Sequence, residues 1–223
     1  MSVMMDLQAV ARATAGKLVG DNVSFSGVST DSRSIADGEL FVALRGDRFD
    51  GHHYLAAAEA RGAVGAIVAA DSIDRLSGLS LPLVQVAETR LSLGALAADW
   101  RSRFNLPVLA VTGSNGKTTT KEMIASILQA AHGDAVLATQ GNYNNDIGLP
   151  LTLLRLNATH RAAIIELGMN HPGEIAYLAG IARPTVALVT NAQRAHLAGM
   201  GSVEAIAAED GRISPGLVET GIA

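Results

Sequence analysis

The sequence contains no cysteine and has few charged residues. None of its 223 residues is Cys, and only 17% are Asp, Glu, Lys or Arg, whereas 48% are hydrophobic. The lack of cysteine excludes a disulfide framework, a thiolate metal site and a cysteine nucleophile. The small charged fraction argues against long disordered segments, and the hydrophobic fraction is large enough for a real core. The length allows one large domain or two modest ones.

Long apolar runs and an excess of basic residues are also missing. No run approaches the roughly 18 apolar residues that a membrane-spanning helix needs. Asp6 interrupts an N-terminus that no basic segment precedes, so we expect neither a membrane contact nor a secretory signal. The net charge of −4 gives no support for nucleic acid as a partner. We therefore expect a cytoplasmic protein.

Residues 108–120, VLAVTGSNGKTTT, predict a phosphate-binding loop. The apolar run 108–111 is typical of a short buried strand. Residues spaced three and four apart predict a helix after the turn: Met123, Ile124, Ile127, Leu128 and Ala131. Glycines let the backbone bend around an anion, and the unpaired N–H groups of a helix start favour negative charge. The predicted nucleotide-binding residues are Gly113, Ser114, Asn115, Gly116, Lys117, Thr118 and Thr119.

Within this loop, Lys117 is expected to reach the β- and γ-phosphates, and the Thr118 hydroxyl is expected to bind Mg²⁺. The usual pattern places its first glycine at Val111, whereas this chain has Gly113 instead. The alternative is a turn that binds nothing. However, a lysine in the first turn of a helix opposes the helix dipole, so it would be unfavourable without an anion. The pattern therefore favours nucleotide binding.

Residues 1–84 predict a small α/β domain, because helices and strands alternate along it. The expected elements are helices at 7–15 and 54–61 and strands at 40–44, 65–69 and 81–86. Two polar clusters, 29–33 (STDSR) and 45–53 (RGDRFDGHH), lie beside predicted strands, where loops often carry ligand contacts. Solvated turns with surface ion pairs are the alternative interpretation of both clusters.

Residues 85–223 predict a second domain that begins with a helix over 89–104. Strand candidates at 135–138, 162–167 and 186–190 alternate with helices, which indicates a mostly parallel sheet with helices on both faces. Ligands collect at the carboxyl ends of such strands. We therefore expect one cleft to contain the polar residues that follow the strands: Asn144, Asn145, Glu166, Asn170, His171 and His196.

Glu166 is the most informative of these polar residues. A carboxylate at the end of an apolar strand is costly if it has no partner, so Glu166 predicts a bound cation. A Mg²⁺ ion held by Thr118 is the natural partner, since magnesium prefers oxygen ligands. The alternative is a partly exposed strand end. His196 is either a ligand or an ordinary hydrogen-bonded histidine.

These motifs resemble the Mur ligase family. TGSNGKT (112–118) is similar to the family's form of phosphate loop, and STDSR and RGDRFDGHHY are similar to its N-terminal domain. The runs GNYNNDIGLPLTLL (141–154) and IELGMNHPGEI (165–175) resemble the member that joins D-alanyl-D-alanine to a UDP-N-acetylmuramoyl tripeptide. The resemblance implies ATP-dependent amide formation through an acyl phosphate, with ATP and Mg²⁺ as cofactors.

The resemblance also assigns roles to individual residues. It implies catalytic roles for Lys117, Glu166 and His196, and a nucleotide cleft lined by Asn144 and Asn145. The implied substrate contacts are Ser29, Thr30, Asp31, Ser32, Arg33, Arg45, Gly46, Arg48, Asp50, His52, Asn170 and His171. The implied metal ligands are Thr118, Glu166, His196 and Asp210.

Two features depart from the family pattern. Relatives carry a lysine after the histidine segment, and its carbamate supports a second metal ion. This chain has Glu209-Asp210 there, and Lys121 is its last lysine, so we expect Asp210 to supply the negative charge directly. The chain also ends part-way through the family's central domain, so we expect it to lack the C-terminal domain and to be unable to complete ligation alone. The complete enzyme is expected to be a monomer, whereas an unpaired sheet edge would favour self-association of this shorter chain.

Two other classes of function stay open. One is another amide ligase of the same superfamily, such as a diaminopimelate- or lysine-adding enzyme or a folylpolyglutamate synthase. The other is a non-catalytic module that binds a UDP-sugar or a nucleotide without turnover. A protein kinase is disfavoured, because nothing in the sequence resembles a kinase catalytic loop.

Overall fold

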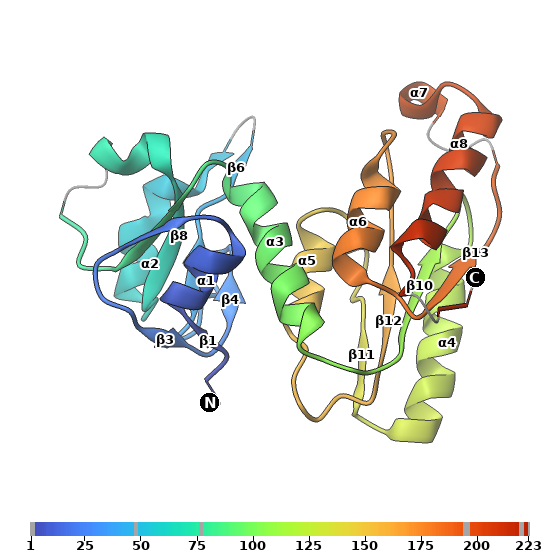
Figure 1. The fold of residues 1–223 in the computed structure, drawn as a ribbon, viewed down its shortest axis with the longest axis horizontal. Coiled ribbons are helices and arrows are strands. Elements are labelled where there is room, and N and C mark those ends of the chain that lie inside the picture. The colour runs from blue at the N-terminus through green and yellow to red at the C-terminus, as the bar shows by residue number, and fades with distance from the viewer. Residues whose placement is uncertain (1–2, 47–48, 76–77, 194–196, 219–220, 223) are drawn as a thin grey trace. The chain divides into compact units, whose positions relative to one another are not determined.

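The computed structural model describes residues 3–46, 49–75, 78–193, 197–218 and 221–222. The chain forms two compact units, Met1–Leu96 and Ala97–Ala223, each with its own central sheet (Figure 1). The division falls within helix α3 (Thr89–Ser102). No helix among the described residues is both long and apolar enough to span a bilayer.

The first unit has a five-stranded sheet. Its strands, in sheet order, are β2 (Lys17–Val19), β9 (Leu83–Val86), β8 (Gly65–Ala69), β5 (Leu40–Val42) and β4 (Val28–Ser29). Only the β2–β9 pair is antiparallel. The other elements are β1 (Met5–Asp6), α1 (Leu7–Ala13), β3 (Ser24–Phe25), β6 (Arg45–Gly46), β7 (Phe49–Asp50), the 3₁₀ helix η1 (Gly51–Tyr54), α2 (Leu55–Ala60) and the 3₁₀ helix η2 (Ala70–Arg75). The small α/β unit expected from the alternating pattern is confirmed.

The second unit has a sheet of four strands that are all parallel. In sheet order they are β11 (Val136–Ala138), β12 (Ala162–Glu166), β10 (Val108–Thr112) and β13 (Val186–Val189). The helices are α4 (Lys117–His132), α5 (Gly148–Leu153), α6 (Glu174–Ala182), α7 (Leu197–Met200), α8 (Val203–Asp210) and the 3₁₀ helix η3 (Gly211–Gly216). In Figure 1, α4 lies on one side of this sheet and α6 on the other, so the predicted parallel sheet with helices on both faces is confirmed.

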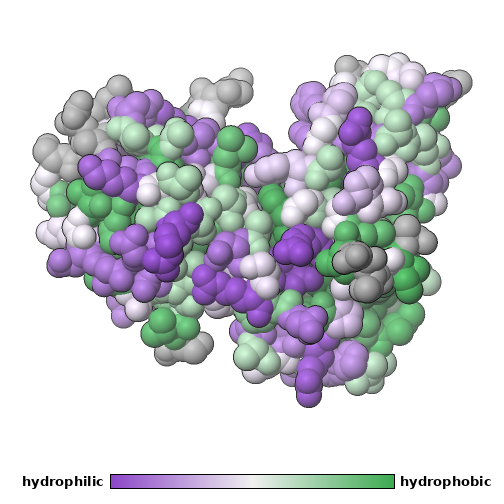
Figure 2. Space-filling model, viewed as in Figure 1, coloured by the Kyte–Doolittle hydropathy of each residue, from purple (hydrophilic) through white to green (hydrophobic). Residues whose placement is uncertain are grey.

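Helix α4 presents a different face to the sheet from the one expected. Ala125 packs with Val111 and Ile164 of the sheet, whereas Met123 and Ile127 are 63% and 68% exposed. The helix predicted from the five apolar residues is confirmed, but these five residues do not all face the sheet. Apolar residues spaced three and four apart can lie on either of two neighbouring faces of this helix. The face that carries Ala125 packs on the sheet because the small alanine side chain lets the helix lie closer to it. Figure 2 shows the resulting hydrophobic surface over α4.

Strand β13 lies at the edge of the four-stranded sheet. Its outer side is partly paired, because Ala187 N–H donates to the Ile222 carbonyl at 2.8 Å and Ile222 N–H donates to the Thr185 carbonyl at 2.9 Å. Leu188 and Val189 further along are 40% and 39% exposed. The edge that the sequence predicted is therefore partly covered, and self-association stays a prediction.

Candidate functional site

The register of the second sheet brings the carboxyl ends of its strands together. Val111 on β10 lies opposite Glu166 on β12, and Thr112 lies opposite Val189 on β13. The loop 113–116 therefore leaves β10 beside the end of both neighbouring strands. The expected convergence of polar residues follows directly from this parallel pairing for Thr112 and Glu166.

The turn into α4 is open on the side where the helix begins. Gly116 precedes α4 with φ +79°, and no side chain caps the helix. A Cβ atom at Gly116 would meet no atom within 4 Å. The first N–H groups of a helix have no acceptor within the helix, and its dipole favours an anion there. The space in front of α4 thus suits a phosphate group.

Gly113 explains the departure from the usual loop pattern. It has φ +126°, and a Cβ atom there would overlap Thr190 Oγ1 and lie 2.9 Å from the Asn191 carbonyl oxygen. Only glycine fits this close approach between the loop and the end of β13. Val111, where the usual pattern has its glycine, is a fully buried residue of β10. The required glycine is therefore two residues later in this chain.

Lys117 lies folded over its own loop. Its Nζ donates to the Gly113 carbonyl at 2.6 Å, and the side chain is half-buried. Thr118 and Thr119 are exposed in the first turn of α4. The structure thus places the predicted lysine and both threonines at the open end of the helix.

Glu166 is buried with one carboxylate oxygen unsatisfied. The residue is 1% exposed, its Oε1 accepts from Asn144 Nδ2 at 2.8 Å, and Oε2 has no hydrogen-bond partner in the part of the chain that the structure describes. Its backbone N–H donates to Thr139 Oγ1 at 3.0 Å. An unpaired buried carboxylate oxygen is costly, and a cation would satisfy it. The predicted proximity of Asn144 and Glu166 is confirmed, and Thr139 is a supporting residue that the sequence analysis missed.

Asp210 is a second buried carboxylate with an unsatisfied oxygen. It ends α8 and is 1% exposed; Oδ1 accepts from Thr112 Oγ1 at 2.9 Å, and Oδ2 has no hydrogen-bond partner among the described residues. Burial raises the pKa of Asp210, while the Thr112 hydrogen bond and the charge of Lys117 act in the opposite direction. Asp210 therefore lies beside the end of β10, 98 residues along the chain from its partner Thr112. The sequence analysis missed Thr112 as that partner.

Other predicted site residues have different surroundings. Asn145 Oδ1 accepts from the N–H groups of Ile147 and Gly148, at 3.2 and 2.8 Å, so its side chain caps the start of α5. The N–H groups of Asn170 and His171 both donate to Glu174 Oε2 ahead of α6. His196 lies outside the described residues. Among the described residues, no three His, Asp or Glu side chains form a group that could hold a metal ion.

Ser114 and Asn115 turn toward the segment after β13. Ser114 Oγ donates to the Gln193 carbonyl at 3.0 Å, and Asn115 Nδ2 donates to Gln193 Oε1 at 2.9 Å. Their side chains are thus held by the protein itself in this conformation. Gln193 carries no sequence signal that would have revealed this role.

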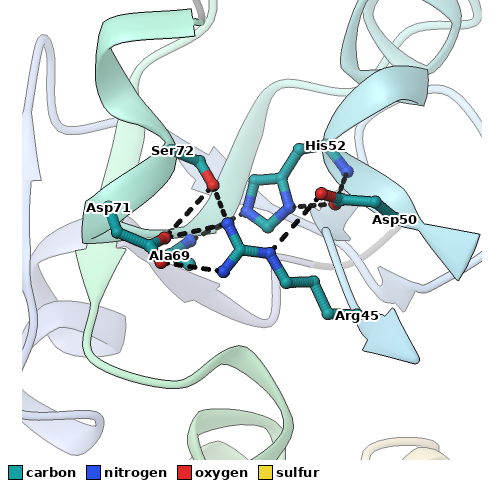
Figure 3. Close-up of polar contacts among 6 residues, drawn as sticks. All are labelled: Arg45, Asp50, His52, Ala69, Asp71 and Ser72. Carbon is teal, nitrogen blue, oxygen red and sulfur yellow. Dashed lines mark hydrogen bonds and ion pairs between the residues drawn. The ribbon is translucent and has the colours of Figure 1, made fainter. Parts of the chain in front are cut away.

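In the first unit, the predicted residues Arg45, Asp50 and His52 form one polar cluster (Figure 3). Arg45 makes two hydrogen bonds to Asp71, at 2.8 and 2.9 Å, and also contacts Ser72. These contacts tie the β6–β7 hairpin to η2. The hydrogen bond of Arg45 to Asp71 lowers the pKa of Asp71.

The buried His52 extends this cluster toward β8. The Ala69 N–H donates to His52 Nε2 at 2.9 Å, so the neutral ring carries its proton on Nδ1, which lies 2.5 Å from Asp50 Oδ1. Burial alone would raise the pKa of Asp50, but hydrogen bonds from His52 and the nearby Arg45 lower it. His52 and Asp50 therefore stabilise the first unit, whatever else they bind.

The second polar cluster of this unit is more exposed. Arg33 forms an exposed ion pair with Asp31 at 2.7 Å, and its hydrogen bonds lower the pKa of Asp31 to about 2. Ser29 Oγ accepts from the Asp31 N–H at 3.2 Å, while Ser32 is buried and Thr30 half-buried. Of the other predicted contacts, Gly46 is exposed, and Arg48 lies outside the described residues.

The first unit is expected to lose stability as the pH falls below about 4. Asp50 has a lowered pKa in the folded state, so its contribution is present above the unfolded pKa and is lost as the pH falls through the folded one. Urea unfolding of the chain at pH 7, 4 and 3 measures this loss. Asp50→Asn keeps an oxygen acceptor for His52 but cannot titrate. Its free energy of unfolding should therefore fall less between pH 7 and pH 3 than that of the wild type. Asp21→Asn, at an exposed position, is the matched control. If the free energy of unfolding fell equally with pH in all three proteins, Asp50 would not be the source of the pH dependence.

Comparisons with known proteins agree with this geometry. A family profile described as the Mur ligase middle domain matches residues 111–223, and one described as the Mur ligase family, catalytic domain, matches residues 24–101. The UDP-N-acetylmuramoyl-tripeptide–D-alanyl-D-alanine ligase of Haemophilus influenzae is 46% identical over 217 residues, which are 96% of this chain and 47% of that protein. The same-named ligase of Escherichia coli K12 is 47% identical over 208 residues, 93% of this chain and 44% of that protein.

Solved structures agree with the sequence relatives. The crystal structure of MurF from Acinetobacter baumannii superposes with a TM-score of 0.87 at 38% identity, over 98% of this chain and 48% of that one. MurF ligase from Thermotoga maritima in complex with ADP superposes with a TM-score of 0.78 at 34% identity, over 88% of this chain and 44% of that one. The chain spans about half the length of the curated relatives that it matches. On the profile matches, the relatives and the superpositions together, the chain belongs to the Mur ligase family.

Proposed function

We propose that this chain is the ATP-binding and UDP-substrate-binding part of a ligase that joins D-alanyl-D-alanine to a UDP-N-acetylmuramoyl tripeptide. The relatives that carry this activity in their names are 46% and 47% identical to it. The observation that carries the proposal is the open helix start at Gly116, which follows β10, together with the buried carboxylate of Glu166 at the end of the neighbouring strand β12. Such a site suits a phosphate and its cation together.

ATP would be held by the loop residues Gly113–Gly116 and by the first turn of α4. ATP supplies the phosphoryl group that activates a substrate carboxylate as an acyl phosphate, which the incoming amine then attacks. Phosphoryl transfer depends mainly on positioning and on neutralising charge. The N–H groups of the first turn and the ammonium group of Lys117, released from the Gly113 carbonyl, would provide both. Thr118 and Thr119 lie in that same first turn.

Magnesium would be bound by Thr118 and Glu166, with Asp210 beside the end of β10, the strand that pairs with β12. The unsatisfied Glu166 Oε2 and Asp210 Oδ2 are the kind of oxygen ligand that this ion prefers. The ion would supply neutralising positive charge next to the phosphates. Asp210 would take the place of the lysine carbamate of relatives, and His196 remains a proposed ligand.

The remaining residues are assigned to substrate. Asn144 orients Glu166 through its 2.8 Å hydrogen bond, and Asn145 shapes the start of α5. Asn170 and His171 follow the end of β12, where a substrate carboxylate could approach. The first unit would bind the UDP-sugar end through two regions, the 29–33 loop and the β6–β7 hairpin.

Replacing Glu166 with Gln tests the metal assignment. We expect Glu166→Gln to weaken the Mg²⁺-dependent part of ATP binding about tenfold, because a neutral amide binds this ion poorly. Binding without Mg²⁺ should be unchanged, and the folded state should be at least as stable, because the amide oxygen still accepts from Asn144 and a buried carboxylate charge is removed. Isothermal titration calorimetry of the chain with ATP, with and without Mg²⁺, gives both values. An equal effect in the two conditions would contradict the assignment.

The substrate assignment needs a turnover experiment. In the full-length protein that carries this chain, ADP release should require a UDP-N-acetylmuramoyl tripeptide and D-alanyl-D-alanine together. Turnover with free amino acids instead would identify another amide ligase of the superfamily. Binding of the UDP-linked peptide without ATP binding or turnover would identify a non-catalytic module and refute the proposal.

A further inference from the structure

Asn191, which follows β13, pairs with both backbone groups of Asn115 in the phosphate loop. The Asn115 N–H donates to Asn191 Oδ1 at 3.1 Å, and Asn191 Nδ2 donates to the Asn115 carbonyl at 3.0 Å. A carboxamide offers one acceptor and one donor side by side, which matches the N–H and C=O groups of a single residue. An aspartate or an aliphatic side chain could not make both bonds.

Further hydrogen bonds join the same two segments. Ser114 N–H donates to the Asn191 carbonyl at 2.9 Å, and Thr190 Oγ1 donates to the Asn115 carbonyl at 2.7 Å. Ser114 Oγ donates to the Gln193 carbonyl at 3.0 Å and accepts from the Gln193 N–H at 2.8 Å. Residues 190–193 therefore continue the pairing of β10 with β13 past the strand ends and into the loop.

This pairing decides which loop groups an anion can reach. The N–H groups of Ser114 and Asn115 are both occupied by Asn191, so they do not face the space ahead of α4. The open position at Gly116, with φ +79°, comes directly after Asn115, the residue whose backbone Asn191 binds. Fixing the backbone of Asn115 fixes the direction in which the chain enters the helix. A loop that is ordered before binding loses less entropy when a ligand arrives.

We infer that Asn191 is a positioning residue for phosphate binding, which holds the loop in its open form without touching the ligand. The inference rests on the proposed nucleotide binding. Because Asn191 acts on the loop backbone, its loss should weaken every ligand that places phosphates there, including inorganic tripolyphosphate, which has no base or sugar.

The test compares wild type with Asn191→Ala and Asn191→Asp. We expect Asn191→Ala to weaken binding of MgADP and of tripolyphosphate by the same factor, about tenfold, because the unheld loop must then be ordered when the ligand binds. The thermal midpoint should stay within about 2 °C of wild type, since Asn191 is only half-buried and surface changes have small effects. Asn191→Asp should bind more weakly still at pH 8, because it repels the anion.

The matched controls are Asn105→Ala and Asn105→Asp. Asn105 is exposed and precedes β10, at the opposite end of that strand from the loop, so its variants should bind as wild type does at every pH. If wild type binds the ligands and Asn191→Ala binds them equally well, the inference is overturned alone. If affinity and thermal midpoint fall together by several degrees, Asn191 serves stability and the inference is also overturned. Failure of wild type to bind either ligand would overturn the nucleotide proposal and this inference with it.

Discussion

Lys117→Ala is expected to weaken binding of MgADP to this chain about 100-fold. Hydrogen bonds to charged groups contribute about 1.5–3 kcal/mol each, and a loss near the upper end of that range corresponds to this factor. Without a ligand, the Lys117 ammonium donates to the Gly113 carbonyl at 2.6 Å in a half-buried position. The substitution should therefore change the stability of the unliganded chain by less than about 1 kcal/mol. Calorimetry gives the affinity, and urea unfolding gives the stability.

The matched control for Lys117 is Lys17→Ala. Lys17 is an exposed lysine of β2 in the first unit, so its loss changes the net charge equally without affecting the loop. Both proteins should be measured at the same ionic strength, since charge effects on binding are screened by salt. Equal affinities for Lys117→Ala and Lys17→Ala would show that the loop lysine does not contact phosphate, and the nucleotide site would have to be sought elsewhere.

Lys121→Ala is expected to lower the free energy of unfolding by about 3 kcal/mol. Lys121 is a fully buried residue of α4, and its ammonium donates to the Thr139 carbonyl at 2.9 Å and contacts Glu122. The alanine variant leaves the Thr139 carbonyl without this donor and opens a cavity where the lysine stem was. Lys121→Met fills most of that cavity, so we expect a smaller loss, about 1–2 kcal/mol. Urea unfolding of the three proteins measures both differences.

The Glu122→Gln variant measures the contribution of the Lys121–Glu122 contact separately from that of the hydrogen bond to Thr139. The Glu122 side chain is 64% exposed, and an exposed ion pair contributes little, so this variant should lose less than about 1 kcal/mol. Thr139 also accepts the Glu166 N–H, so the lysine links α4 to the strand end that carries the proposed metal ligand. If Lys121→Ala were as stable as Glu122→Gln, the buried ammonium would have no structural role.

The phosphate loop could be predicted from the sequence because its signals are local. An apolar run, two glycines and a lysine before a helix lie within residues 108–117, and each acts on its own neighbours. The positive φ angles of Gly113 and Gly116 are of the kind that glycine adopts at no steric cost. The position of Glu166 at a strand end could be predicted equally well from the sequence, because parallel strands in this fold class end at one edge of the sheet.

The buried face of α4 could not be predicted in the same way. Lys121, Ala125 and Leu128 lie on one stripe of α4 that faces the sheet. Because one member of this stripe is a lysine, the spacing of apolar residues does not identify the stripe. Its burial depends on the Thr139 carbonyl, which another strand supplies. The spacing of apolar residues along α4 does not reveal that a carbonyl group from a distant part of the chain will accept from the lysine.

By itself, the sequence determined the class of each unit, the phosphate loop and the family to which the chain belongs. Only the tertiary structure decided which residues hold that loop. Asn115 and Asn191 are 76 positions apart, and Thr112 and Asp210 are 98 apart. These pairs meet because β13 is the neighbour of β10 and α8 ends beside it, an arrangement set by the packing of the whole unit. Local backbone preferences act over a few residues, so contacts across such separations become visible only once the strand order is known.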